Sequence, residues 1–254
     1  MKTKLFAVAL VVALNLSAVA ATKKPAPSLH RAGNPAAKLP SGDTPNPVPP
    51  ALCKPCLFYG GDINVDNENA AGMSDENTLL IVGGSSTYGA VNIPEGVTAK
   101  VFGILFNVQA DAAFDPLTAT YDVRTGVTDG NGGTSIASGS GPAIVQATGR
   151  NFLGLNEYTV QVSWSTPLTL TAGEYWFNVT PQCLNTLDGS CSVFRQFVSN
   201  SNLANAVRGS WQPVHEMFLN STFFGFTFTN WCDSSLGFNT IQCAGMSFGL
   251  RGTE

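Results

Sequence analysis

Two short segments contain residue types whose spacing could support chemistry, and the first is Cys53-Lys54-Pro55-Cys56. Its Cys-x-x-Cys form is that of thiol–disulfide catalysts, in which the first thiol needs a helix N-terminus to lower its pKa. Here the motif follows a proline-rich segment and precedes Leu57-Phe58-Tyr59, which is typical of a strand. The sequence therefore favours a structural disulfide over a redox centre.

The second segment is the acidic stretch 62–76. Asp62, Asn64 and Asp66 occupy alternate positions, as the first oxygen ligands of a calcium loop do. The pattern then departs from such loops, because Asn67 stands where glycine is needed and Met73 where a bidentate carboxylate is needed. Two interpretations stay open: a calcium site at Asp62, Asn64 and Asp66, or a solvated loop whose side chains bond their own backbone.

Catalysis by other side chains has little support in the sequence. The two histidines are His30 and His215, too few for a histidine-rich zinc site, and no nucleophile motif accompanies His215. Glycoside hydrolysis needs only two carboxylates, which Glu157, Glu174 and Glu216 could supply. We expect no catalytic residue, with a glycoside hydrolase or another carboxylate-dependent hydrolase as the alternative.

Aromatic residues give the best argument for binding. In the run 174–180, Tyr175 and Phe177 share one face of a strand, so Trp176 points to the other face. An outward indole is a surface on which a sugar ring can stack, although a covering loop is the alternative. The candidate residues for carbohydrate binding are Trp176, Trp211 and Trp231.

These residues must be positioned by strands, because apolar and polar residues alternate along many short segments. Glycine-rich turns separate the segments, and no stretch shows helical periodicity. The pattern predicts an all-β, antiparallel β-sandwich of about ten strands, of jelly-roll type, with a bulge near Gly103. The expected strands are Thr78–Val82, Val97–Val108, Thr118–Arg124, Pro142–Thr148, Glu157–Trp164, Glu174–Thr180, Thr222–Thr229 with Phe224, Phe226 and Phe228 inward, and a last strand with Met246, Phe248 and Leu250.

The N-terminal part predicts export. Residues 1–20 have the basic start, short apolar run and small final residues of a secretory signal peptide, and no later segment predicts a transmembrane span. Residues 21–56 predict a disordered Pro/Ala/Lys-rich spacer, and residues 57–254 a single domain. We expect a secreted protein, extracellular or held in the periplasm or at the cell surface.

An exported chain with an even number of cysteines predicts disulfides. Sequence alone leaves the pairing open, and neighbouring cysteines are the expected partners: Cys53 with Cys56, Cys183 with Cys191, and Cys232 with Cys243.

Charge is divided unevenly along the chain. Residues 21–56 have a net charge of +4, whereas residues 57–254, with six basic and sixteen acidic side chains, have a net charge of −10. An acidic body repels phosphates, so no nucleic-acid partner is expected. A polysaccharide or another envelope component is the expected partner.

Four stretches resemble a group of secreted bacterial proteins. They are Tyr59–Asp62 with Asp75–Asn77, Val123–Val127 with Gly130–Gly133, Thr148–Arg150 through Glu157–Val160, and Ala172–Val179. The chain is similar in these stretches to uncharacterised, jelly-roll-like β-sandwich proteins, several of which carry C-terminal envelope-sorting tails. The resemblance implies a bacterial, exported module and transfers no catalytic residue. This chain shows no such tail after its last expected strand.

Together these patterns predict a secreted, non-enzymatic binding or structural module of the bacterial envelope or extracellular space. Carbohydrate is the expected ligand class, and no cofactor other than calcium is considered.

Overall fold

The computed structural model describes residues 49–63, 71–74, 77–78, 84–110, 114–183, 196–201, 204–230 and 245–254. Within these ranges, the backbone alone is described for residues 71–74, 77–78, 183, 213, 215 and 216.

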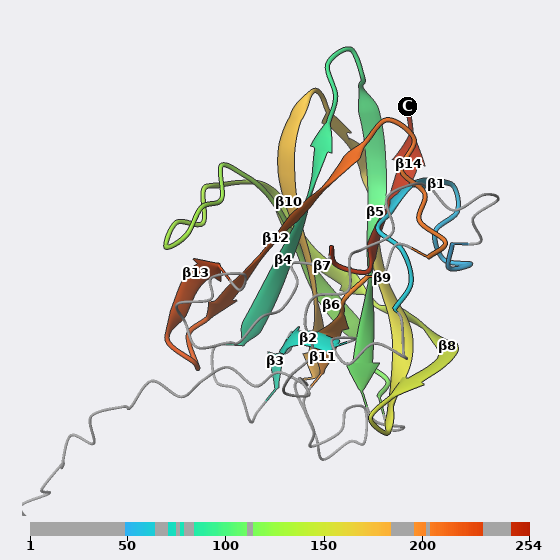
Figure 1. The fold of residues 1–254 in the computed structure, drawn as a ribbon, viewed down its shortest axis with the longest axis vertical. Coiled ribbons are helices and arrows are strands. Elements are labelled where there is room, and N and C mark those ends of the chain that lie inside the picture. Colours follow the sequence, from blue (N-terminus) through green and yellow to red (C-terminus); the bar gives the residue numbers. More distant parts are fainter. Residues whose placement is uncertain are drawn as a thin grey trace, which may run out of the picture.

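The described chain forms fourteen strands in two sheets, which confirms the all-β sandwich and exceeds the expected number of strands (Figure 1). We name the sheets after their central strands. The β5 sheet contains β1 (Cys56–Tyr59), β2 (Ala71–Ser74), β5 (Ala99–Ala110), β8 (Ile144–Phe152), β9 (Leu155–Leu170), β11 (Phe197–Ser199) and β14 (Phe248–Thr253). The β10 sheet contains β3 (Asn77–Thr78), β4 (Ser85–Ile93), β6 (Thr118–Thr125), β7 (Thr134–Pro142), β10 (Gly173–Cys183), β12 (Gln212–Ser221) and β13 (Phe226–Asn230).

Both sheets are antiparallel except where the short β3 pairs in parallel with the end of β10. In the β5 sheet, β9 pairs along the whole of β5, and β14 and β11 share the other side of that strand. Strand β8 extends this sheet beyond β9, and β1 extends it beyond β14. The order in the β10 sheet is β13-β12-β4-β10-β6-β7.

The core lies between the two sheets and follows from the alternation of side chains. Ile104 and Phe106 of β5 turn inward beside Val160 of β9, and Phe177 and Val179 of β10 meet them from the other sheet. All five side chains are buried. The inward face predicted for strand 174–180 is therefore confirmed.

The bulge expected near Gly103 is present. Val101 pairs with Leu168 and Gly103 pairs with Ser163, so Phe102 alone lies opposite residues 164–167 of β9. A bulge bends a strand and re-aims its side chains. Here it turns the indole of Trp164 so that its Nε1 donates a hydrogen bond to the backbone oxygen of Val101 at 3.1 Å.

Two expected strands are wrong in their bounds. The segment Pro142–Thr148 is not one strand, because β7 ends at Pro142 in one sheet and β8 begins at Ile144 in the other. Residues 222–225 form a turn, and β13 begins only at Phe226. Phe224, Phe226 and Phe228 are all buried, but only the first two join the main core, since a φ of 41° at Phe228 accompanies a change of side.

A disulfide joins Cys53 to Cys56, which confirms that pair and seats the start of the described chain on the β5 sheet. Cys53 is buried although it falls within the expected spacer, because it packs with Leu52 and Cys56 against Tyr59 and Leu105. The side chains of the other four cysteines lie outside the described residues.

Close packing where β1 meets β14 predicts that Gly60→Ala is destabilising. A Cβ at Gly60 would lie 2.4 Å from the backbone oxygen of Met246, which has no flexible end that could move aside. We expect a loss of about 2–3 kcal/mol in the free energy of unfolding, measured by urea denaturation. Gly245→Ala is the matched control, since its Cβ would meet no atom within 4 Å. Equal stability of the two variants would contradict this packing.

Candidate functional site

Of the two interpretations of Trp176, an exposed ring or a covered ring, the structure shows the covered one. The Trp176 side chain is turned away from the main core, as the alternation requires, but it is only 1% exposed. Trp211 is also 1% exposed and belongs to the main core, where its Nε1 donates to Oε1 of Glu254 at 2.8 Å. Neither indole offers a surface to a sugar in this structure, and Trp231 lies outside the described residues.

Trp176 is covered by side chains that are distant in the sequence. The ring of Phe218 meets its edge at a centroid distance of 4.9 Å, and Phe228 and Val127 complete the cover. The loop that carries Val127 is held there by a hydrogen bond from the backbone N–H of Gly130 to the carbonyl oxygen of Phe228. The alternative of a covered tryptophan is therefore the one that the structure shows.

A charged cluster overlies this second apolar cluster. The guanidinium of Arg124 pairs with Asp122 and lies 5.0 Å from the ring centroid of Phe228, a cation–π contact. The hydroxyl of Tyr88 donates to Asp122 at 2.9 Å. Burial, followed by the charge of Asp122, raises the pKa of Tyr88 well above its ordinary value of 10.0. These contacts hold the strands of the β10 sheet together.

The outer face of the β5 sheet, which is turned away from the β10 sheet, carries a buried polar layer. Asn107 of β5 donates to the hydroxyls of Tyr59 and Ser247, both at 2.8 Å, and accepts from Thr159 of β9 at 2.7 Å. The Tyr59 hydroxyl in turn donates to Asp62 at 2.6 Å. The layer connects β5 and β9 to the segment that follows β1.

Arg150 joins the two carboxylates of this layer. Its Nε lies 2.5 Å from Oε2 of Glu157, and its Nη1 lies 3.1 Å from Oδ2 of Asp62. The Thr148 hydroxyl donates to the same Glu157 oxygen at 2.8 Å. A bulge in β8 makes this possible, because residues 148–150 lie opposite Glu157 alone and Gly149 adopts a φ of 82°.

Burial changes the acidity of two groups in the polar layer. Desolvation raises the pKa of Glu157 above its ordinary value of 4.5, and the charge of Arg150 offsets this only in part. Desolvation, and then the charge of Asp62, raises the pKa of Tyr59 well above 10.0. Glu157 is 1% exposed, so its carboxyl group does not face solvent. It joins β9 to β8 through Thr148 and Arg150.

A small pocket opens beside this layer. Its volume is about 160 Å³, below the range of about 300–1,000 Å³ that is usual for small-molecule sites. Its lining is Pro50, Ala51, Asp62, Gln146, Ala147, Thr148, Arg150 and Thr159. A volume of this size has room for water or a small ion. The guanidinium of Arg150 in the pocket wall is already bound to two carboxylates, which offset its positive charge.

Asp62, the first residue of the expected calcium loop, already has donors on both oxygens. Tyr59 donates to Oδ1, while Asn205 and Arg150 contact Oδ2. Asn64 and Asp66 lie outside the described residues, and within the described ranges no three His, Cys, Asp or Glu side chains gather as metal ligands. Calcium binding stays a prediction. It would require Asp62 to give up its present partners in favour of the metal ion.

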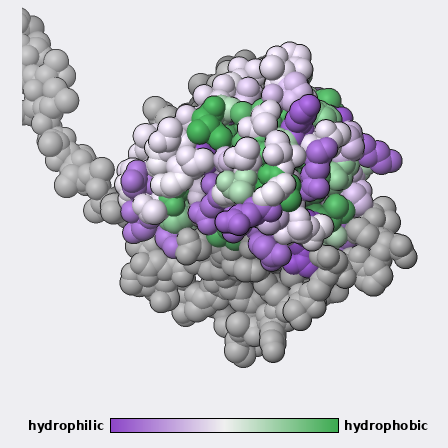
Figure 2. Space-filling model, turned by 90° about the horizontal axis from the view of Figure 1, so that it is seen from above, coloured by the Kyte–Doolittle hydropathy of each residue, from purple (hydrophilic) through white to green (hydrophobic). Residues whose placement is uncertain are grey.

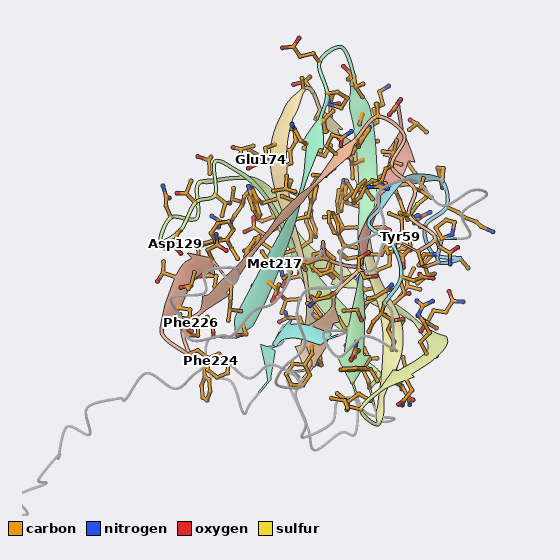
Figure 3. All side chains as sticks on the ribbon, viewed as in Figure 1. Tyr59, Asp129, Glu174, Met217, Phe224 and Phe226 are labelled. Carbon is orange, nitrogen blue, oxygen red and sulfur yellow. A yellow bond between two sulfur atoms is a disulfide. The ribbon has the colours of Figure 1, made fainter. Side chains whose placement is uncertain are left out.

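The candidate carboxylate pair of a hydrolase is not brought together by the described residues. Glu157 lies on the outer face of the β5 sheet, whereas Glu174 lies on the outer face of the β10 sheet and accepts from Trp176 Nε1 at 3.0 Å. Figure 3 accordingly shows Tyr59, beside the first site, and Glu174 on opposite sides of the molecule. The side chains of His215 and Glu216 lie outside the described residues.

Trp164 and Tyr121 form a site that the sequence reasoning missed. Their rings stack at a centroid distance of 4.5 Å and an interplanar angle of 23°, with each side chain half-buried. Trp164 comes from the bulge of β9 and Tyr121 from β6, so the pair bridges the two sheets. Gly139 lies opposite Tyr121, where any Cβ would be 2.9 Å from its hydroxyl. Of the tryptophans that the structure describes, Trp164 is the one with access to solvent.

No protein-family model, curated protein or solved structure matches this chain. In the part of the chain that the structure describes, no helix has the length and apolar character needed to cross a membrane. On the face seen in Figure 2, apolar residues form small patches between polar ones.

The ion pair of Arg150 predicts a loss of stability in Arg150→Met, because Asp62 and Glu157 would lose the cation between them. Removing one partner of a buried pair costs about 3–5 kcal/mol, and we expect about 2–3 kcal/mol here since Arg150 is partly exposed. Urea denaturation measures the loss. Lys100→Met, at an exposed cation on β5, is the control and should change the stability little.

The pKa of Glu157 predicts how this loss depends on pH. A carboxyl group whose pKa is higher in the folded than in the unfolded chain contributes stability below pH 4.5, and this contribution is lost as pH rises through the raised pKa. Without the charge of Arg150 the pKa of Glu157 rises further. Arg150→Met should therefore lose more stability than the wild type as pH rises from 4.5 through the raised pKa. Adding Glu157→Gln should remove the extra loss. Parallel pH profiles of Arg150→Met and the wild type would contradict the assignment.

Proposed function

We propose that the protein is a secreted, non-enzymatic module of the bacterial envelope or extracellular space that binds polysaccharide at Trp164 and Tyr121. The half-exposed, stacked ring pair carries this proposal. Sugars bind aromatic rings through their apolar C–H faces, and two rings that are already fixed lose little conformational entropy on binding.

The surroundings of the ring pair suit a polyhydroxylated ligand. Ser165 and Thr166, next to Trp164 in the bulge, are exposed. Hydroxyl groups can both donate to and accept from sugar hydroxyls. None of these residues is charged, so a neutral polymer fits the site better than an ionic ligand does.

The use made of the buried ionisable groups supports a module without catalysis. Glu157 and Asp62 share Arg150, and Asp122 binds Arg124 and Tyr88. Apart from the Asp122–Arg124 pair, which lies within β6, each contact joins different strands or loops of the same sheet. A general acid or base must instead reach substrate from an accessible position, and Glu157, the most buried of these groups, does not occupy one.

Export is supported by the disulfide between Cys53 and Cys56 together with the expected signal peptide. The expected spacer would separate such a module from whatever holds its N-terminal end. An acidic body agrees with a neutral polysaccharide and disfavours nucleic acid.

The proposal predicts that Trp164→Ala loses binding to the polysaccharide that retains the wild type. The wild type is run through native gels containing cellulose, chitin, xylan or peptidoglycan fragments, and retardation gives the affinity. We expect about a tenfold loss in Trp164→Ala, within the range of about 1–3 kcal/mol that stacking of a nucleic-acid base on one aromatic ring contributes, and partial retention in Trp164→Phe.

Two controls separate binding from folding and from catalysis. Leu153→Ala changes an exposed apolar residue at the β8–β9 turn and should keep wild-type retardation. Thermal melts check that Trp164→Phe remains folded. Release of reducing ends from the retained polymer by the wild type would establish the hydrolase alternative. Unchanged retardation of both Trp164 variants would remove this residue from the site.

A further inference from the structure

Strand β7 forms an open edge of the β10 sheet. It pairs with β6 alone, and every residue from Thr134 to Pro142 is exposed or half-exposed. Among the described residues, no backbone group outside β6 bonds to this strand. Its second row of N–H and C=O groups is therefore available to another strand.

Other edges of the two sheets are blocked. At β13, the carbonyl of Phe228 accepts from Gly130, and the N–H of Asn230 donates to Asp129 at 2.8 Å. At β1, the backbone of Tyr59 exchanges hydrogen bonds with Val207. At β8, the bulge that contains Arg150 interrupts the ladder. Natural sheets use such devices against edge pairing, and along 137–142 β7 has none of them except the terminal Pro142.

The chemistry of β7 permits close approach of an identical strand. Residues 134–142 contain no charged side chain, although residues 57–254 have a net charge of −10. Two acidic bodies would repel each other least where this uncharged strand lies between them. Serine, alanine and glycine side chains along 137–141 are small, so no bulk prevents the backbones from pairing.

Exposed apolar residues lie at the two ends of this edge. Of the four large apolar residues that are exposed in the described chain, Ile136 (40%) begins the edge, and Leu117 (69%) and Ile144 (49%) lie at its far end. Ile136 is the extra residue of a bulge, because Ala137 pairs with Val123 and Ser135 with Arg124. The backbone N–H of Ala143 donates to Leu117, which keeps the far end together.

We infer that β7 pairs with β7 of a second copy of this chain, antiparallel, over residues 138–142. In this register the two-fold axis passes between the two copies of Ser140, which lie opposite each other, so Ser138 of each copy lies opposite Pro142 of the other. Ile136 of each copy then approaches Ile144 of its partner. An antiparallel pair brings the start of β7 in one copy next to the end of β7 in the other, and this contact occurs at both ends of the interface. The exposed aliphatic residues are covered there. The inference does not depend on the polysaccharide.

Sedimentation velocity of the secreted chain without its signal peptide tests the pairing across a concentration series. We expect a reversible dimer in the wild type. Ser140→Lys should weaken its association at least about tenfold, because two lysines would face each other at the axis. Ser210→Lys, at an exposed turn position away from β7, should leave the dimer unchanged.

A mixing experiment shows whether the effect acts through the pairing itself. Ser140→Lys and Ser140→Glu should each be monomeric alone, and an equimolar mixture should form a heterodimer, since opposite charges then face each other across the axis. Ser140 is exposed, so both variants should fold, and thermal melts verify this. A wild type that stays monomeric, a Ser140→Lys variant that stays dimeric, or a mixture that does not associate would each overturn the inference.

Discussion

The pairing of β5 with β9 is the constraint on which the rest of the molecule depends. Along this ladder Phe106 faces Val160 toward the core, while Asn107 faces Thr159 on the outer side. Side chains alternate with period two, so a slip by one residue would put Asn107 into the core and Phe106 outside. One register therefore determines both the apolar core and the buried polar layer.

Bulges then place the side chains that regular strands could not. The bulge opposite Phe102 turns Trp164 toward Val101 and Tyr121. The bulge at Gly149 aims Thr148 and Arg150 at one oxygen of Glu157. The bulge between β5 and β9 places Trp164 on the inner side of the β5 sheet. The bulge in β8 places Thr148 and Arg150 on the outer side of the same sheet. The same local device thus closes the gap between the sheets at one place and joins β8 to the N-terminal segment at another.

Local patterns in the sequence were sufficient for much of the fold. Alternation identified β6 and the inward face of β10, and the change of phase near Gly103 located a bulge. Strand β7 was missed because its serines and glycines do not alternate with large apolar residues, most of its residues being exposed. Alternation reports burial of large apolar side chains, so it cannot detect a strand that contributes almost none of them.

The sites were less predictable than the strands. Alternation gave the direction of Trp176 correctly, but its cover comes from Phe218, Phe228 and Val127, and no local pattern reports that these segments meet. Arg150 had a signal that was not used. It precedes a tight hairpin at Leu153-Gly154, where both φ values are positive, so it comes close to Glu157 across the turn.

The buried polar layer explains why the N-terminal segment is part of the folded body. Asn107 and Glu157 project from the outer face of the β5 sheet, where burial without partners would be costly. Tyr59 accepts a hydrogen bond from Asn107, and Asp62 binds the same Arg150 that pairs with Glu157. The Cys53–Cys56 disulfide with β1 holds the segment in place. The sheet needs this segment to satisfy its polar groups, and the segment needs the sheet to bury Phe58 and Tyr59. The segment from Cys53 to Asp62 is therefore part of the folded body and packs directly on β5, the central strand of its sheet.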